Sequence, residues 1–230
     1  MFELTEIMRQ KDDSVFAELL NRVREGHQTR EDIALLCTRS ITTTQSVYSE
    51  VKNELHLFPC NAAVDSHNEQ LFNELSSEKA EITCSDAVLG EDPDDVKQRI
   101  LKQISGKKTN DTGNLSQVLK VALGLQYDTT HNVSIEDGIC NGTPCVLKKI
   151  HYMHHSVIPS CLWVEFPDRF IGRKTRKEYM HYYKRYPEVS TEWTPIWSVR
   201  RTFMFRRKAI VRQQFPLKAS SAKTIHKEEE

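Results

Sequence analysis

Hydrophobic positions near the start of the chain follow the period of a strand and then that of a helix. FELTEIMR (2–9) alternates enough to predict a short strand. A helix capped by Asp12 or Asp13 and ended by Gly26 should follow, with an apolar stripe formed by Phe16, Leu19, Leu20 and Val23. Thr29 caps a second short helix, in which we expect three residues to be buried: Ile33, Leu35 and Leu36.

The next segments alternate between strand and helix. ELHLFP (54–59) predicts a buried strand, and NAAVDSHNEQLFNEL (61–75) predicts a helix capped by Asn61. A strand followed by a helix is half of a βαβ unit. Another helix is expected over 93–104, with proline in its first turn. The polar, turn-rich stretch 105–113 should mark a domain boundary.

Beyond residue 118 the pattern changes to short apolar segments separated by turns. These segments, rich in Val, Ile, Trp and Phe, continue to residue 205 and are typical of small β-barrels. The stretch 168–193 interrupts them and is expected to be a long charged loop. RKAIVRQQFPL (207–217) predicts a strand that returns to the first domain, and SSAKTIHK (220–227) is expected to begin a helix.

Charge divides the chain into two unequal parts. Residues 1–145 carry 14 Lys and Arg against 24 Asp and Glu, whereas residues 146–227 carry 18 against 5. The basic part is interleaved with seven aromatic residues: Trp163, Phe166, Phe170, Tyr179, Tyr182, Tyr183 and Tyr186. Such a block indicates either a surface for a phosphate backbone with stacking platforms or a solvated, flexible basic loop.

Composition narrows the class of protein. The chain has 230 residues, of which 38% are hydrophobic and 28% charged, and this fits one or two soluble globular domains. No apolar run approaches the roughly 20 residues of a membrane span, and the start, MFELTEIMRQ, lacks the features of a signal peptide. We therefore expect an intracellular protein without a membrane partner, in which the six irregularly spaced cysteines are reduced thiols.

Two groups of residues raise the hypotheses of a metal site and of a nucleophile. The first group invites a zinc interpretation: Cys140, Cys145, His154, His155 and Cys161. Its spacing fits no known class of zinc site, so buried cysteines on barrel strands are favoured. Cys60 and His67 resemble a nucleophile and a base, but no third group orients them, which favours a strand end and a helix surface.

SGKKT (105–109) resembles part of a phosphate-binding loop. Such a loop needs G-x-x-x-x-G-K-[ST] between a strand and a helix, so that backbone N–H groups wrap the phosphates. Position 101 is Leu, and Lys108 stands where Ser or Thr is required. No acidic pair after an apolar strand offers a Walker B site, so we expect no nucleotide-binding loop in this chain.

Four segments are similar, in order, to segments of one helicase family. They are FELTEIMRQKDDSVFAELLNRVREG (2–26), HLFPCNAAVDSHNEQLFNEL (56–75), LKVALGLQYDTTHNVSIEDGICNGTPCVLKKI (119–150) and QFPLKASSAKTIHK (214–227). The first segment matches the family's arginine–glutamine pair before a helix, and the second matches the strand and helix that follow. The third matches a run that ends in a glycine turn and Asn-Gly, and the fourth matches the approach to motif V. The chain thus resembles the Pif family of superfamily 1, RecD-like, ATP-dependent DNA helicases, including relatives carried by Helitron-type transposons.

The resemblance implies an α/β fold in which a second RecA-like helicase domain is incomplete. Residues 1–115 would be the first part of that domain and 116–206 an inserted small SH3-like β-barrel. Residues 207–230 would be a truncated return to the RecA-like domain. The missing first RecA-like domain, with its phosphate loop and Walker B acid, would be a partner of this chain.

The resemblance also implies roles for individual residues. Arg9 would be an arginine finger that reaches the γ-phosphate of ATP held on the other RecA-like domain, with Gln10 beside it. Contacts to single-stranded DNA are implied for five residues: Thr224, His226, Lys227, Asn61 and His67. ATP and magnesium would belong to the intact parent, and neither is expected to bind this chain alone.

The positions at which this sequence differs from the family's pattern determine which function we expect. Ser220 stands where alanine is usual, LQYDTT (125–130) replaces an apolar run, and nothing of motif VI follows Lys227. We expect a fragment of a nuclear 5'-3' helicase of DNA repair, recombination or telomere maintenance, which contributes DNA contacts without hydrolysing ATP. Two alternatives stay open: a non-enzymatic module that binds single-stranded nucleic acid, and a non-functional remnant whose uncompleted sheet exposes its edges.

Overall fold

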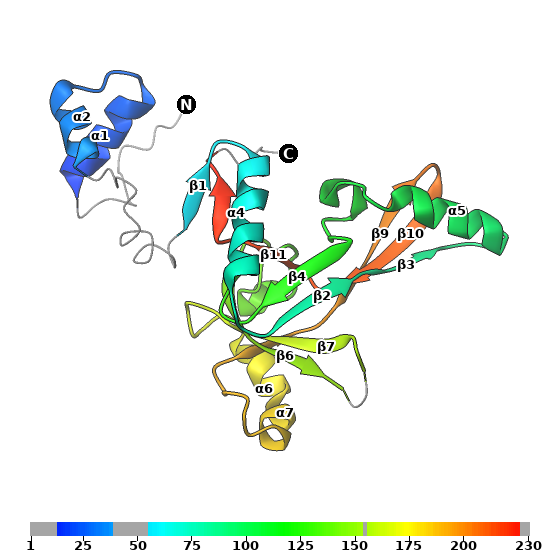
Figure 1. Ribbon diagram of the computed structural model, residues 1–230. Helices are drawn as coiled ribbons and strands as arrows, with labels where there is room; N and C mark the ends of the chain where they lie inside the picture. Colours follow the sequence, from blue (N-terminus) through cyan, green and yellow to red (C-terminus); the bar gives the residue numbers. More distant parts are fainter. Residues whose placement is uncertain (1–12, 39–54, 154–155, 226–230) are drawn as a thin grey trace. The chain divides into compact units, whose positions relative to one another are not determined.

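The computed structural model describes residues 13–38, 55–153 and 156–225 of the chain. It divides into two compact units, residues 1–53 and 54–230 (Figure 1). Arg9, Gln10, His226 and Lys227, like the strand predicted over 2–9, lie outside the described residues. None of the helices in the described part of the chain is both long and apolar enough to cross a bilayer.

The described part of the first unit consists of two short helices, α1 (Ser14–Arg24) and α2 (Arg30–Cys37). The Asp13 carboxylate accepts from Phe16 N at 2.9 Å, which confirms the predicted cap of α1. Thr29 and Asp32 form a reciprocal capping box at the start of α2. The Asp32 carboxylate also accepts from Arg22 at 2.6 and 2.7 Å, and this bond with Arg22 and those with Thr29 keep the pKa of Asp32 low.

The apolar faces of these two helices are less buried than the sequence predicts. Ala17 and Leu19 are buried in α1, whereas seven apolar residues are not: Phe16, Leu20, Val23, Val15, Ile33, Leu35 and Leu36. The expected burial of α2 is therefore wrong for the described residues. The Arg22–Asp32 ion pair connects α1 to α2.

The second unit begins with a parallel pair of strands covered by a helix. Strand β1 (His56–Phe58) pairs with β12 (Ala222–Thr224), and helix α4 (Asn61–Glu74) packs against both, as Figure 1 shows. The predicted strand and helix are thus confirmed, but the predicted burial of the strand is wrong, because Leu55 and Leu57 are exposed. The helix expected from residue 220 is wrong, because this segment pairs with β1 as a strand. His56 N donates to Ser221 O, and Ile225 N donates to Phe58 O.

The second unit also contains two smaller sheets, one of two strands and one of three. Strand β2 (Lys79–Thr83) pairs with β4 (Val118–Ala122), and β10 (Lys208–Gln214) pairs with both β3 (Ser85–Val88) and β9 (Val199–Phe205). Helix α5 (Asp94–Ile104) packs beside β3, as predicted for 93–104, and four residues form the small core there: Val88, Ile100, Ile104 and Ile210. Strand pairing therefore joins residues on both sides of the predicted boundary at 115, and that boundary stays a prediction.

The largest sheet has five strands in the order β11-β5-β6-β7-β8. Its strands are β5 (Gln126–Thr129), β6 (Pro144–Tyr152), β7 (Pro159–Glu165), β8 (Thr194–Ile196) and β11 (Leu217–Ala219). The sheet is open: β11 and β8 are its edges, and the described strands form no closed barrel. The mixed α/β class is confirmed, but the expected SH3-like barrel is not.

The stretch 168–193 is not the charged loop that composition predicts. It contains helices α6 (Arg173–Glu178) and α7 (Met180–Arg185), which are labelled in Figure 1. Helix α6 contacts β8, and Tyr183 of α7 packs against Trp163 of β7. Two short 3-10 helices complete the described elements: η1 (Thr109–Thr112) and η2 (Ile135–Asp137). The helices were not predicted because the segment mixes Arg, Lys, Tyr and His and shows no aliphatic stripe. The face that packs against the protein is aromatic.

Candidate nucleic-acid interface

The carboxyl ends of β1 and β12 form one edge of the parallel pair. Phe58 and Thr224 are register partners at this edge, and α4 begins three residues after Phe58, at Asn61. In open α/β sheets, ligands bind outside the carboxyl ends of parallel strands, where a helix begins. The described chain places Thr224 and Asn61, two residues predicted to contact DNA, at this edge.

The first turn of α4 has no side-chain cap. Cys60 is the N-cap residue and makes no capping hydrogen bond, so Asn61 is the first helical residue rather than the predicted cap. Within the described chain, Val64 N bonds to Cys60 O, but the earlier N–H groups of the 14-residue helix have no partner. Such N–H groups and the positive end of the helix dipole suit a phosphate.

Two side chains of α4 hold the helix against the strands. Asn68 Oδ1 accepts from Ala222 N at 3.1 Å, which fixes the start of β12. The His67 ring lies 4.4 Å from the ring of His56 and 5.2 Å from that of Phe58. These contacts position the first turn of α4 relative to the strand ends.

His67 is buried rather than presented to solvent. Burial lowers the pKa of His67, and the charge of His56 lowers it further. Its Nε2 has no partner within the described chain. The structure thus gives His67 a packing role, and the direct contact with nucleic acid stays a prediction.

The aromatic residues of the basic block are largely core. Trp163 and Tyr183 are buried with Cys161 and Val189, and their rings are 5.3 Å apart in an edge-to-face arrangement. Phe166 is buried in the main core. A stacking role is therefore wrong for Trp163, Tyr183 and Phe166, whereas the side chain of Phe170 is 60% exposed.

Two of the six cysteines behave as buried small apolar residues. Cys145 and Cys161 are buried, and burial raises the pKa of the Cys145 thiol to about 12. Cys60 is exposed at the start of α4, while the His67 ring packs against His56. In the described chain no cluster of His, Cys, Asp or Glu could hold a metal ion, and His154 and His155 lie outside it.

One residue that positions the basic block was missed at the sequence level. Asp137 belongs to the turn Glu136-Asp137-Gly138, yet its carboxylate accepts from Lys174 N at 2.7 Å and from Thr175 N at 2.8 Å. It thereby caps the start of α6 from a distance of 37 residues in sequence. The sequence offers one signal for this role, an acidic residue in a turn. The spacing between Asp137 and α6 gives no further sign of the contact.

Comparison with known proteins places this fold among helicases. No protein-family model and no curated protein matches the chain. Among solved structures, it is similar to a Pif1 helicase from Candida albicans, with a TM-score of 0.59 and 18% identity over 96% of this chain and 46% of that one. It is also similar to Pif1 from Bacteroides in complex with ADP-AlF3 and ssDNA, with a TM-score of 0.51 and 17% identity over 98% of this chain and 42% of that one.

A third match shows the same relation. Bacteroides sp Pif1 in complex with ADP-AlF4 has a TM-score of 0.52 and 15% identity over 96% of this chain and 41% of that one. The chain therefore has a Pif1-helicase-like fold and spans less than half the length of the helicases that it matches.

Proposed function

We propose that this chain supplies single-stranded DNA contacts of a Pif-type DNA helicase. The observation that carries the proposal is the uncapped first turn of α4 at the carboxyl edge of β1 and β12. The N–H group of Asn61 would bind a backbone phosphate, and the hydroxyl of Thr224 would bind a neighbouring one. Lys227 and His226 are proposed to continue this set of contacts.

The proposal assigns no ATP chemistry to the described residues. A nucleotide does not fit SGKKT (105–109), since the first and last residues of the phosphate-loop pattern are absent. The N–H of Gly106, which such a loop would turn to a phosphate, donates to Gln117 Oε1 at 2.8 Å. Arg9 and Gln10 keep their proposed role toward ATP held on another RecA-like domain.

A second function, that of a binding module without motor activity, is favoured by the charge of residues 146–227. Eighteen basic against five acidic residues would attract a nucleic-acid backbone without any motor domain. The two functions differ in what the chain needs. The module binds single strands with its full affinity by itself, whereas the helicase part binds them measurably by itself and more tightly beside the first RecA-like domain.

Fluorescence anisotropy of a labelled single-stranded oligonucleotide, titrated with the full chain at low and moderate salt, tests the proposal. We expect binding that weakens steeply with salt, because phosphate contacts release counterions. Thr224→Val, which keeps the shape of the side chain and removes the hydroxyl, should weaken binding of all sequences alike. Undetectable binding, or binding that does not change with salt, would overturn the proposal.

A further inference from the structure

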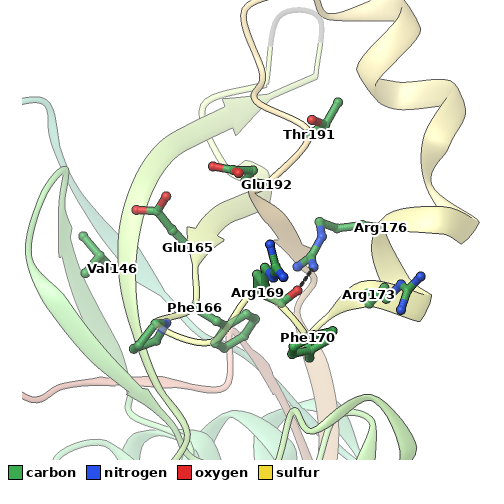
Figure 2. Close-up of a pocket in the computed structure, with 10 residues that line it drawn as sticks. Val146, Glu165, Phe166, Arg169, Phe170, Arg173, Arg176, Thr191 and Glu192 are labelled. Atoms are coloured by element: carbon green, nitrogen blue, oxygen red, sulfur yellow. Dashed lines mark hydrogen bonds between the residues drawn. The ribbon is translucent and has the colours of Figure 1, made fainter.

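A cavity of about 780 Å³ opens between the end of β7 and the segments that flank the helix pair α6 and α7. Figure 2 shows its lining side chains: Arg169 comes from the segment before α6, Arg173 and Arg176 come from α6 itself, and Glu192 comes from the segment after α7. This volume lies within the range of small-molecule sites. The cavity is separate from the α4 edge and uses none of its residues.

The arginine segment is held in one conformation by backbone contacts. Arg176 donates to Ile171 O at 2.7 Å, to Thr194 Oγ1 at 2.8 Å and to Arg169 O. Gly172 adopts φ +77°, and a Cβ there would lie 2.4 Å from Thr194 Oγ1. The hydrogen bonds of the Arg176 guanidinium are thus used within the protein, and they fix the backbone that carries Arg169.

The other two arginines of the cavity are available to a ligand. In the described chain, the Arg173 guanidinium has no hydrogen bond or ion pair, and that of Arg169 lies 5.3 Å from the centroid of the Phe170 ring. Arg169 and the exposed Phe170 form a cation–π pair, which offers a flat surface. Planar guanidinium groups and an aromatic ring are the groups that hold phosphates and bases of single strands.

A carboxylate faces the same space. Glu165 is engaged by Lys148 at 2.7 Å, whereas within the described chain the Glu192 carboxylate has no partner. Figure 2 shows Glu165 and Glu192 on one side of Arg169 and the Phe170 ring on the other. An unpaired carboxylate beside arginines is an acceptor for the N–H groups of a ligand.

We propose that this cavity binds one guanine nucleotide of a DNA single strand. The base stacks on the Arg169–Phe170 pair, and its N1–H and N2–H groups donate to the two oxygens of Glu192. Arg173 binds the adjoining phosphate. The other bases cannot present two such parallel donors to one carboxylate, so guanine is preferred. This inference rests on the proposed function, since it assumes that the chain binds single-stranded DNA.

The test compares two labelled oligonucleotides of equal length, one of thymines only and one with isolated guanines between thymines, each titrated with the full chain. We expect the guanine oligonucleotide to bind about tenfold more tightly, the discrimination typical of a bidentate base contact. Glu192→Gln should abolish this preference, because its amide places a donor against the donors of guanine. Arg173→Ala should weaken binding of both oligonucleotides by the same factor.

A matched control removes the same charge elsewhere. Glu178→Gln changes an exposed carboxylate at the end of α6, outside the cavity lining, and should leave the preference unchanged. Equal binding of both oligonucleotides, or equal effects of the two Gln variants, would overturn the guanine site while leaving DNA binding intact. Failure of the wild-type chain to bind either oligonucleotide would overturn the proposed function together with the site.

Discussion

The α4 edge and the arginine cavity differ in the kind of contact that we propose each makes with DNA. At the edge, the donors are backbone N–H groups at the start of α4. In the cavity they are the side chains of Arg169 and Arg173, accompanied by Glu192. Backbone donors bind the phosphate of any nucleotide, whereas side chains with donors and acceptors select a base. If both proposals hold, affinity and base preference reside in separate regions and can be altered separately.

Gly172→Ala should have the largest effect on stability, and of the two regions only the cavity should be distorted. The substitution combines a positive φ with a steric clash against Thr194, so we expect it to lower the free energy of unfolding by about 3 kcal/mol. Urea denaturation would measure this loss. Gly142→Ala is the matched control, since φ there is +85° but no atom lies within 4 Å, and its cost should be only about 1 kcal/mol.

The same variant sharpens the comparison of the two regions. Gly172→Ala should reduce base preference, because Arg169 and Phe170 lose their support, while binding of an all-thymine oligonucleotide at the α4 edge persists below the temperature of unfolding. Equal costs for Gly172→Ala and Gly142→Ala would mean that the contact with Thr194 does not hold the arginine segment in place.

Cys60→Asp should change stability and binding in opposite directions. An aspartate at the N-cap of α4 accepts from the free N–H groups and stabilises the helix by about 1 kcal/mol. The same carboxylate occupies the phosphate donors and repels DNA, so affinity for any single strand should fall about tenfold. Thermal unfolding and anisotropy measure the two effects. Cys60→Ala, which adds neither a cap nor a charge, should change neither; a stabilised chain with unchanged affinity would exclude the edge as a contact.

His67→Phe should have the smallest effect, and only on the pH dependence of stability. The pKa of His67 is lowered in the folded chain by burial and by His56, so the unfolded chain binds a proton more readily. Its contribution to stability is present above the ordinary pKa of about 6.5 and is lost as pH falls through the lower folded value. Phenylalanine keeps the ring packing and removes this loss. Urea denaturation between about pH 5 and 8 should show a shallower dependence for the variant; identical slopes would contradict the burial argument.

Local capping and apolar spacing predicted the elements that depend on nearby residues. Asp13 and Thr29 cap their helices as expected, and the strand before α4 lies where ELHLFP predicts it. The helix of residues 93–104 is confirmed for the same reason, because its apolar residues follow one face. Each of these caps, strands and helices depends on residues within a segment of about a dozen positions.

Features that depend on distant pairing were not predictable. Residues 222–224 form a strand only because β1, more than 160 residues earlier, offers a partner. The α6 and α7 pair packs through Trp163 and Tyr183, and its start is capped by Asp137 from another part of the chain. Thr224 and Asn61, singled out from the sequence, lie at the carboxyl edge of β1 and β12, but the absence of a cap at Cys60 appeared only in the structure.

The most direct test of the account compares Asn61→Pro with Asn61→Ala in single-strand binding by the full chain. Proline is accepted at the first helical position and removes one N–H, whereas alanine removes only the side chain. We predict that Asn61→Pro binds all single strands about tenfold more weakly than Asn61→Ala, the loss of one charge-assisted hydrogen bond, with no loss of stability. Equal affinity of the two variants would contradict the claim that the first turn of α4 binds the DNA backbone.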